Sequence, residues 1–254
     1  MKITVVSPKR ISVFVLAALL FFSATVALKK TGAYSVFYGY ALRKLPVYSV
    51  RTTEKKLAIS FDCAWGVDYT DLLLSVMAEE DVKCTFFAVQ FWVEKYPEYV
   101  GKIFDAGHEI GTHSKTHPHM SRLDKNAIVS ELTSSKEAIE KITGKPVELF
   151  RPPFGDYDDL LLETAEELGL YTIQWSVDSL DWKDLSAKEI EARVVKNAKS
   201  GSIVLFHNQG LHTAEALPNI IKSLKNAGYS FVTIGELIYK NGYEILPNGE
   251  QIKV

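Results

Sequence analysis

From Lys56 onward, short apolar runs alternate with helical patterns, and this alternation limits the possible folds more than any other feature of the sequence. The runs are rich in β-branched and aromatic residues, which favour strands, and strands separated by helices are typical of βα units around a parallel sheet. The expected strands are Leu57–Asp62, Cys84–Val89, His108–Thr112, Val147–Phe150, Tyr171–Trp175, Ser202–Phe206 and Tyr229–Val232. We therefore predict an α/β fold, a distorted (β/α) barrel with about seven parallel strands.

Capping signals mark several of the intervening helices. Asp124 is placed to begin a helix that runs to Ile142 and stops at Gly144. Capping boxes are expected at Ser186 with Glu189 and at Thr233 with Glu236. In the tail, Pro247-Asn248-Gly249 between apolar pairs predicts a terminal hairpin.

The first part of the chain differs from the rest. Ile11–Leu28 is an uncharged apolar run long enough to cross a membrane core of roughly 30 Å, and basic residues precede it. We predict a transmembrane signal-anchor at 1–28, with a cleaved signal peptide as the alternative, because Thr25-Val26-Ala27 resembles a cleavage site. A connector at 29–55 and one domain at 56–254 follow, which implies an extracytoplasmic protein, either membrane-anchored or secreted.

Charge and cysteine content exclude two classes of protein. The chain has 29 Lys and Arg against 31 Asp and Glu, and five of the basic residues but no acidic one fall in the first 30 residues. The remaining acidic domain has no basic face for nucleic acid. Two cysteines cannot form a disulfide scaffold, and a Cys63–Cys84 bridge is not expected, because one would end a parallel strand while the other begins the next, roughly 17 Å away.

Polar residues follow the expected strands at their carboxyl ends, where α/β barrels build their sites. They are Asp62, His113, Arg151, the pair Asp178 and Asp181, and His207. His113 and His117 lie four residues apart, so one helical turn or a tight loop would bring both imidazoles to one metal. The pattern therefore indicates a catalytic or metal site at this edge of the sheet.

Five ordered segments carry a resemblance to a known family. They are Ser60-Phe61-Asp62, His113-Ser114-Lys115-Thr116-His117, Arg151-Pro152-Pro153-Phe154-Gly155, Asp178-Ser179-Leu180-Asp181-Trp182 and Leu205-Phe206-His207. Together they resemble the motifs of polysaccharide deacetylases, the NodB homology domain or carbohydrate esterase family four, over about 56–239. The hydrophobic start and the first motif most resemble the sporulation-associated PdaB-like branch.

The resemblance implies a role for each motif residue. Asp62 would be the general base and His207 the general acid, with Arg151 keeping Asp62 ionised and Asp181 orienting His207. His113 and His117 would hold a divalent metal, with zinc expected. Substrate contacts would come from Pro153, Phe154, Asp178, Trp182 and Leu205, with Trp182 and Leu205 forming the wall of an acetyl pocket. For Arg151 and Asp181, a purely structural ion pair is the competing interpretation.

Cys63 departs from the family pattern, in which a second aspartate, itself a metal ligand, follows the first. Three interpretations compete: a Cys63 thiolate completes a zinc site, Asp68 reaches in from the next loop, or the metal site is weak or absent and Cys63 only fills a small buried space. We therefore expect a hydrolase of carbon–nitrogen bonds that acts as a monomer and deacetylates peptidoglycan-type glycan. The alternatives are an impaired relative that binds glycan through Trp65, Trp175 and Trp182, and hydrolysis of another amide.

Overall fold

The computed structural model describes residue 23 and residues 44–254, and the fold is that of the compact unit Leu45–Val254. The predicted anchor at 1–28 and most of the connector at 29–55 lie outside the described residues. Within the described part, no helix is long and apolar enough to cross a membrane.

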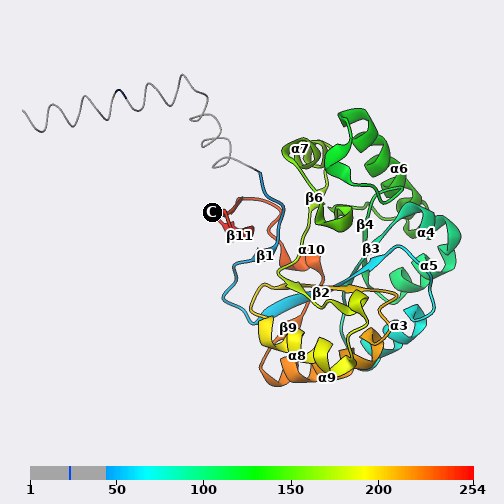
Figure 1. Ribbon diagram of the computed structural model, residues 1–254, viewed down its shortest axis with the longest axis vertical. Coiled ribbons are helices and arrows are strands. Elements are labelled where there is room, and N and C mark those ends of the chain that lie inside the picture. Colours follow the sequence, from blue (N-terminus) through cyan, green and yellow to red (C-terminus); the bar gives the residue numbers. More distant parts are fainter. Residues whose placement is uncertain (1–22, 24–43) are drawn as a thin grey trace, which may run out of the picture. The chain divides into compact units, whose positions relative to one another are not determined.

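A curled parallel sheet forms the centre of the unit, with the strand order β6-β5-β4-β3-β2-β8-β7, and β9 pairs with β2 (Figure 1). All seven predicted strands are present, and each of these pairings is parallel. The strands are β2 Lys56–Cys63, β3 Thr85–Ala88, β4 Glu109–Thr112, β5 Leu149–Phe150, β6 Tyr171–Thr172, β7 Val177–Asp178, β8 Ile203–His207 and β9 Ser230–Phe231. The sheet is a half-barrel, because β6 and β7 form its two edges and do not pair with each other among the described strands.

A segment before the first predicted strand covers this opening. Val47 pairs with Ile173 just beyond β6, and Ser49 pairs with Ser202 just before β8. β1, Ser49–Val50, also joins the terminal hairpin of β10, Tyr243–Ile245, and β11, Glu250–Lys253, in a three-stranded sheet. The hairpin prediction is confirmed.

Helices surround the outside of the sheet (Figure 1). They are α3 Thr70–Glu79, α4 Gln90–Lys95, α5 Pro97–Asp105, α6 Lys125–Thr143, α7 Asp159–Glu167, α8 Ala187–Asn197 and α9 Thr213–Asn226, whereas the short α10 Ile234–Leu237 packs inside the curl. The Asp124 cap and both capping boxes form as predicted, and Gly144 ends α6 at φ 65°.

Two apolar clusters result from the alternation of side chains along the strands. The larger cluster lies between the outer face of the sheet and the helices and includes Leu57, Ile59 and Phe61 of β2. The smaller one fills the inside of the curl, with Ala58 and Ile203 against α10. Thr85 and Glu109 bond to the start of α10 at the amino end of this inner face, and the predicted site lies at its carboxyl end.

Candidate active site

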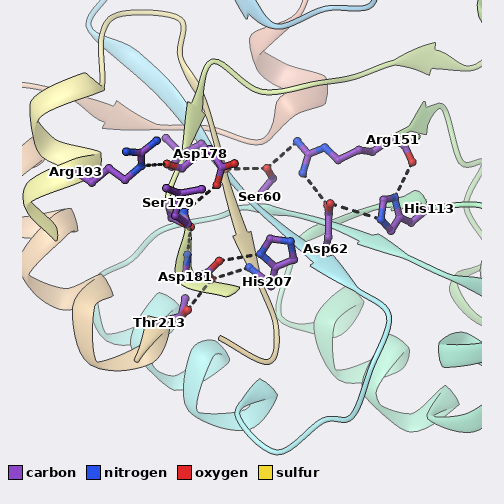
Figure 2. Close-up of polar contacts among 12 residues, drawn as sticks. Ser60, Asp62, His113, Arg151, Asp178, Ser179, Asp181, Arg193, His207 and Thr213 are labelled. Atoms are coloured by element: carbon purple, nitrogen blue, oxygen red, sulfur yellow. Dashed lines mark hydrogen bonds and ion pairs between the residues drawn. The ribbon is translucent and has the colours of Figure 1, made fainter. Parts of the chain in front are cut away.

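Asp62 and His207 are direct neighbours at the carboxyl ends of two paired strands. Their Cα atoms are register partners of β2 and β8. His113 follows β4, Arg151 follows β5, and Asp181 lies in the 3₁₀ turn Asp181–Lys183 after β7. Figure 2 shows these side chains converging on one region, as predicted from the sequence.

Arg151 lies behind Asp62. Its Nη1 donates to Asp62 Oδ1 at 2.8 Å, and its Nη2 donates to Ser60 Oγ at 2.9 Å and to the Gln174 carbonyl at 3.2 Å. The guanidinium is fully buried and packs on the Phe87 ring at 4.2 Å. Burial acts to raise the pKa of Asp62, but the charge and hydrogen bond of Arg151 outweigh it, and the pKa is lowered. Asp62 is therefore ionised near neutral pH.

The charges around His207 are the reverse of those around Asp62, because the fully buried partner of His207 is a carboxylate. His207 Nδ1 donates to Asp181 Oδ1 at 2.8 Å, while Asp181 Oδ2 accepts from the His207 backbone at 2.8 Å and from Thr213 Oγ1 at 2.6 Å. Asp181 is fully buried, whereas 31% of the His207 side chain is exposed. Burial acts to lower the pKa of His207, but the bond and charge of Asp181 outweigh it, and the pKa is raised. The imidazolium form is thus favoured at an open position.

The two candidate metal ligands lie beside Asp62. His113 Nδ1 is 2.7 Å from the Arg151 carbonyl, which only accepts, so Nδ1 carries the proton and Nε2 presents a lone pair. The His113 and His117 ring centroids are 5.0 Å apart. Burial lowers the pKa of both, that of His117 to about 4, so both imidazoles are neutral near pH ~7.

This geometry fits a cation. His113 Nε2 and Asp62 Oδ2 are 3.5 Å apart in a buried position, and each presents lone pairs to the other, a contact that a bound cation would stabilise. Across residue 23 and residues 44–254, however, no group of three His, Cys, Asp or Glu side chains is arranged to bind a metal. The two imidazoles predicted as metal ligands therefore lie together, and within the described residues no third ligand joins them.

The structure contradicts the proposed ligand role of Cys63. Its side chain belongs to the outer apolar cluster together with Ile59 and Phe61, on the opposite face of β2 from Asp62. It is fully buried there, and burial, with the Asp62 charge adding to it, holds the pKa of the thiol well above its usual value. The alternative ligand, Asp68, instead accepts a hydrogen bond from Gln209 at 2.6 Å. Cys63 and Cys84 are both buried and unbridged.

The predicted substrate-binding residues lie at this end of the sheet in different environments. Phe154 and Trp182 are 62% and 56% exposed, whereas Pro153 and Leu205 are buried. Asp178 ends β7, and its carboxylate accepts from the Leu180 backbone at 2.8 Å, which fixes the turn that leads to Asp181.

Several site loops carry backbone strain. Ser114, His117, Phe154 and Leu180 have positive φ values between 57° and 73° without being glycines. Such conformations are costly for residues with a Cβ and cluster at functional sites. All four lie within the predicted motifs, so the motifs specify backbone geometry as well as side chains.

Three supporting residues were not predicted as site residues. Ser60 connects Arg151 to β8, Thr213 holds Asp181, and Asn208 binds the loop after β2. Ser60 could have been predicted from the sequence, since a polar residue two positions before Asp62 in an apolar strand must face the same side as Asp62. Thr213 begins α9, and no sequence pattern predicts its contact with Asp181.

Comparisons with known proteins agree with this geometry. A family model for polysaccharide deacetylases matches residues 49–173. A peptidoglycan-N-acetylglucosamine deacetylase of Bacillus cereus is 38% identical over 200 residues, which is 76% of this chain and 93% of the relative. The chain belongs to the polysaccharide deacetylase family.

Two further polysaccharide deacetylase relatives differ in what is said of their activity. The peptidoglycan-N-acetylmuramic acid deacetylase PdaA of Bacillus subtilis is 35% identical, and the match covers 76% of this chain and 75% of the length of PdaA. The crystal structure of BA3943 from Bacillus anthracis, described as a family-four carbohydrate esterase pseudoenzyme, matches with a TM-score of 0.74 and 32% identity, covering 82% of this chain and 70% of its own. A mutant of BA3943 is described as having restored enzymatic activity. The fold is thus shared by active and inactive relatives.

Proposed function

We propose that this chain hydrolyses N-acetyl groups of a peptidoglycan-type cell-wall glycan, releasing acetate and leaving a free amine. The proposal rests on one observation above the others: Asp62 and His207 are neighbours whose environments shift their pKa values in opposite directions. A pair kept as carboxylate and imidazolium is what an acid–base hydrolysis requires.

In this mechanism Asp62 accepts a proton from the attacking water, and His207 donates its Nε2 proton to the leaving amine nitrogen. Arg151 keeps Asp62 charged, and Asp181 holds the His207 ring with Nδ1 occupied, so that Nε2 is the atom turned to the substrate. His113 and His117 would hold a divalent metal, for which zinc suits two imidazoles. When bound, such a metal would polarise the amide carbonyl and stabilise the negative charge that develops on its oxygen.

We also propose that the protein acts outside the cytoplasmic membrane, because cell-wall glycan lies there and the run Ile11–Leu28 has the length of an export or anchor segment. The resemblance to the PdaB-like branch supports a role in sporulation. Counting heat-resistant spores of a deletion strain tests that role.

The direct test is acetate release from N-acetylated peptidoglycan strands by the full chain, with zinc added and after chelation. We expect activity that His207→Ala abolishes, and about one metal per chain that the double variant His113→Ala/His117→Ala loses. Leu72→Ala, an exposed change on α3, is the matched control. Acetate release that persists without His207 would contradict the proposed mechanism.

The second candidate is a glycan-binding protein without turnover. The missing third ligand at Cys63 and the similarity to the BA3943 pseudoenzyme favour it. Strand binding without acetate release under any metal condition would establish this alternative.

A further inference from the structure

Glu131 of α6 bonds to the middle of the loop that joins His113 to His117. Its Oε2 accepts from the backbone N–H groups of Lys115 and Thr116, both at 2.8 Å, and its Oε1 accepts from Thr116 Oγ1 at 2.6 Å. Hydrogen bonds in which a carboxylate is the acceptor are stronger than those between neutral groups. One side chain from a neighbouring helix therefore holds two consecutive residues of the loop.

The two ends of the loop are held by hydroxyl groups. The Ser114 N–H donates to Thr112 Oγ1 at 3.2 Å, and the His117 N–H donates to Ser114 Oγ at 3.0 Å. Thr112 Oγ1 is in turn 2.5 Å from the hydroxyl oxygen of Ser135, which lies on α6 one turn after Glu131. All four backbone N–H groups of residues 114–117 thus donate to side-chain oxygens, and α6 supports the loop at two points.

The conformation of the loop is one that requires such support. Ser114 and His117 have φ values of 73° and 59°, which are costly for residues with a Cβ and persist only where the surrounding structure fixes them. The bonds from Glu131 lie between these two positions. His113 is buried and bonded to the Arg151 carbonyl, whereas His117 is only half-buried, so the position of the His117 ring depends more on the loop.

We propose that Glu131 is a positioning residue of the metal site, because it holds the strained loop so that the His117 imidazole stays beside that of His113. The inference rests on the proposed function, in which these two imidazoles hold a divalent metal. Both oxygens of Glu131 bond to the loop, and no group of three metal ligands is found in the part of the chain that the structure describes, so this carboxylate acts through the backbone. Its loss should weaken metal binding and not only the fold.

The test is a calorimetric titration of the full, metal-free chain with Zn²⁺, without substrate. Loss of a residue that orients metal ligands typically lowers metal affinity about 10–100-fold, and we expect Glu131→Ala to raise the zinc Kd by about tenfold. Glu131→Gln should restore most of the affinity, because its amide oxygen can accept both backbone N–H groups and its amide N–H can donate to Thr116 Oγ1. Glu137→Ala, an exposed change on the same helix, is the matched control and should leave the zinc Kd unchanged.

Urea unfolding of the metal-free variants separates positioning from a structural role. A lowered unfolding midpoint of Glu131→Ala with an unchanged zinc Kd would overturn the inference, and so would an affinity loss that Glu131→Gln shares in full. If Glu131→Ala does not fold, Thr116→Val replaces it, since this exposed change removes only one of the three bonds. It should raise the zinc Kd about twofold or more, and an unchanged Kd would again overturn the inference.

The outcomes distinguish this inference from the proposed function. If the unmodified chain binds no zinc, Glu131 positions no metal ligand and the inference fails. If the unmodified chain releases acetate but Glu131→Ala binds zinc as tightly, only the inference fails. If zinc affinity falls in Glu131→Ala and recovers in Glu131→Gln while the unmodified chain releases no acetate, Glu131 is a positioning residue and the proposed catalysis fails.

Discussion

The two faces of the β2–β8 pair have different compositions and different uses. On the inner face, Ser60 is the register partner of Leu205, and Asp62 that of His207. On the outer face, Phe61 is the partner of Phe206, with ring centroids 5.7 Å apart, and Cys63 continues the apolar row. At the carboxyl end of this pair, alternate residues therefore face the site, and those between them pack in the outer apolar cluster.

The difference teaches that neighbours in sequence can have unrelated roles. Asp62 and Cys63 are consecutive, yet one is ionised beside Arg151 and the other lies in an apolar cluster with its thiol protonated. Changes on the inner face should alter the rate, and changes on the outer face should alter the stability.

Asp62→Asn should have the largest effect on rate. Removing a general base costs about 10²–10⁴-fold, so acetate release should fall within that range. The variant keeps an acceptor for Arg151, and circular dichroism should show that it still folds. Activity close to that of the unmodified chain would remove Asp62 from the role of base.

Arg151→Met tests whether the inner face also matters for stability. It leaves the Asp62 charge buried without its partner, and breaking a buried pair in this way destabilises a fold by roughly 3–5 kcal/mol. Urea unfolding measures this loss, and acetate release should fall as well, because unpaired Asp62 binds a proton more readily. An unchanged unfolding midpoint would show that solvent or another group replaces the guanidinium.

Asp181→Asn should change the pH dependence of the reaction. Because Asp181 helps to hold the pKa of His207 above 6.5, the unmodified chain should lose rate only as the pH rises through that raised value. The same shift contributes stability that is fully present below 6.5 and is lost as the pH rises through the folded-state pKa. In the variant the alkaline limb of a pH–rate profile should move to lower pH. An unmoved limb would mean that another group donates the proton.

Cys63→Ala should have the smallest effect. Loss of a buried sulfur should lower the unfolding free energy by about 1 kcal/mol, while acetate release and metal content per folded chain stay unchanged. Elemental analysis beside the double variant His113→Ala/His117→Ala gives the comparison. Loss of metal in Cys63→Ala would show that the thiol is a metal ligand, and the outer face would then not serve packing alone.

Much of the fold was predictable because strand composition and helix caps are local signals. The seven strands and the caps at Asp124, Ser186 and Thr233 were found in this way. β7 was not expected, because the two residues Val177–Asp178 show no periodicity.

The candidate site was predictable in its residues and only partly in its geometry. Motif residues follow strands, so their convergence could be expected. The position of Cys63 was also predictable, since alternation from Asp62 puts it on the opposite face, where it fills a small buried space as one of the three interpretations has it. The Thr213 contact depends on where α9 begins relative to Asp181, which tertiary packing decides.

The pairing of β1 with β11 has a consequence for how the molecule is made. Ser49 pairs with Glu250 and Val50 with Gln251, so nearly the whole domain lies between the partners. Contacts of such long sequence separation form late and slowly. In the segment that covers the opening between β6 and β7, β1 therefore gains this partner strand only after the final residues are synthesised, and a chain truncated before Glu250 would leave β1 without it.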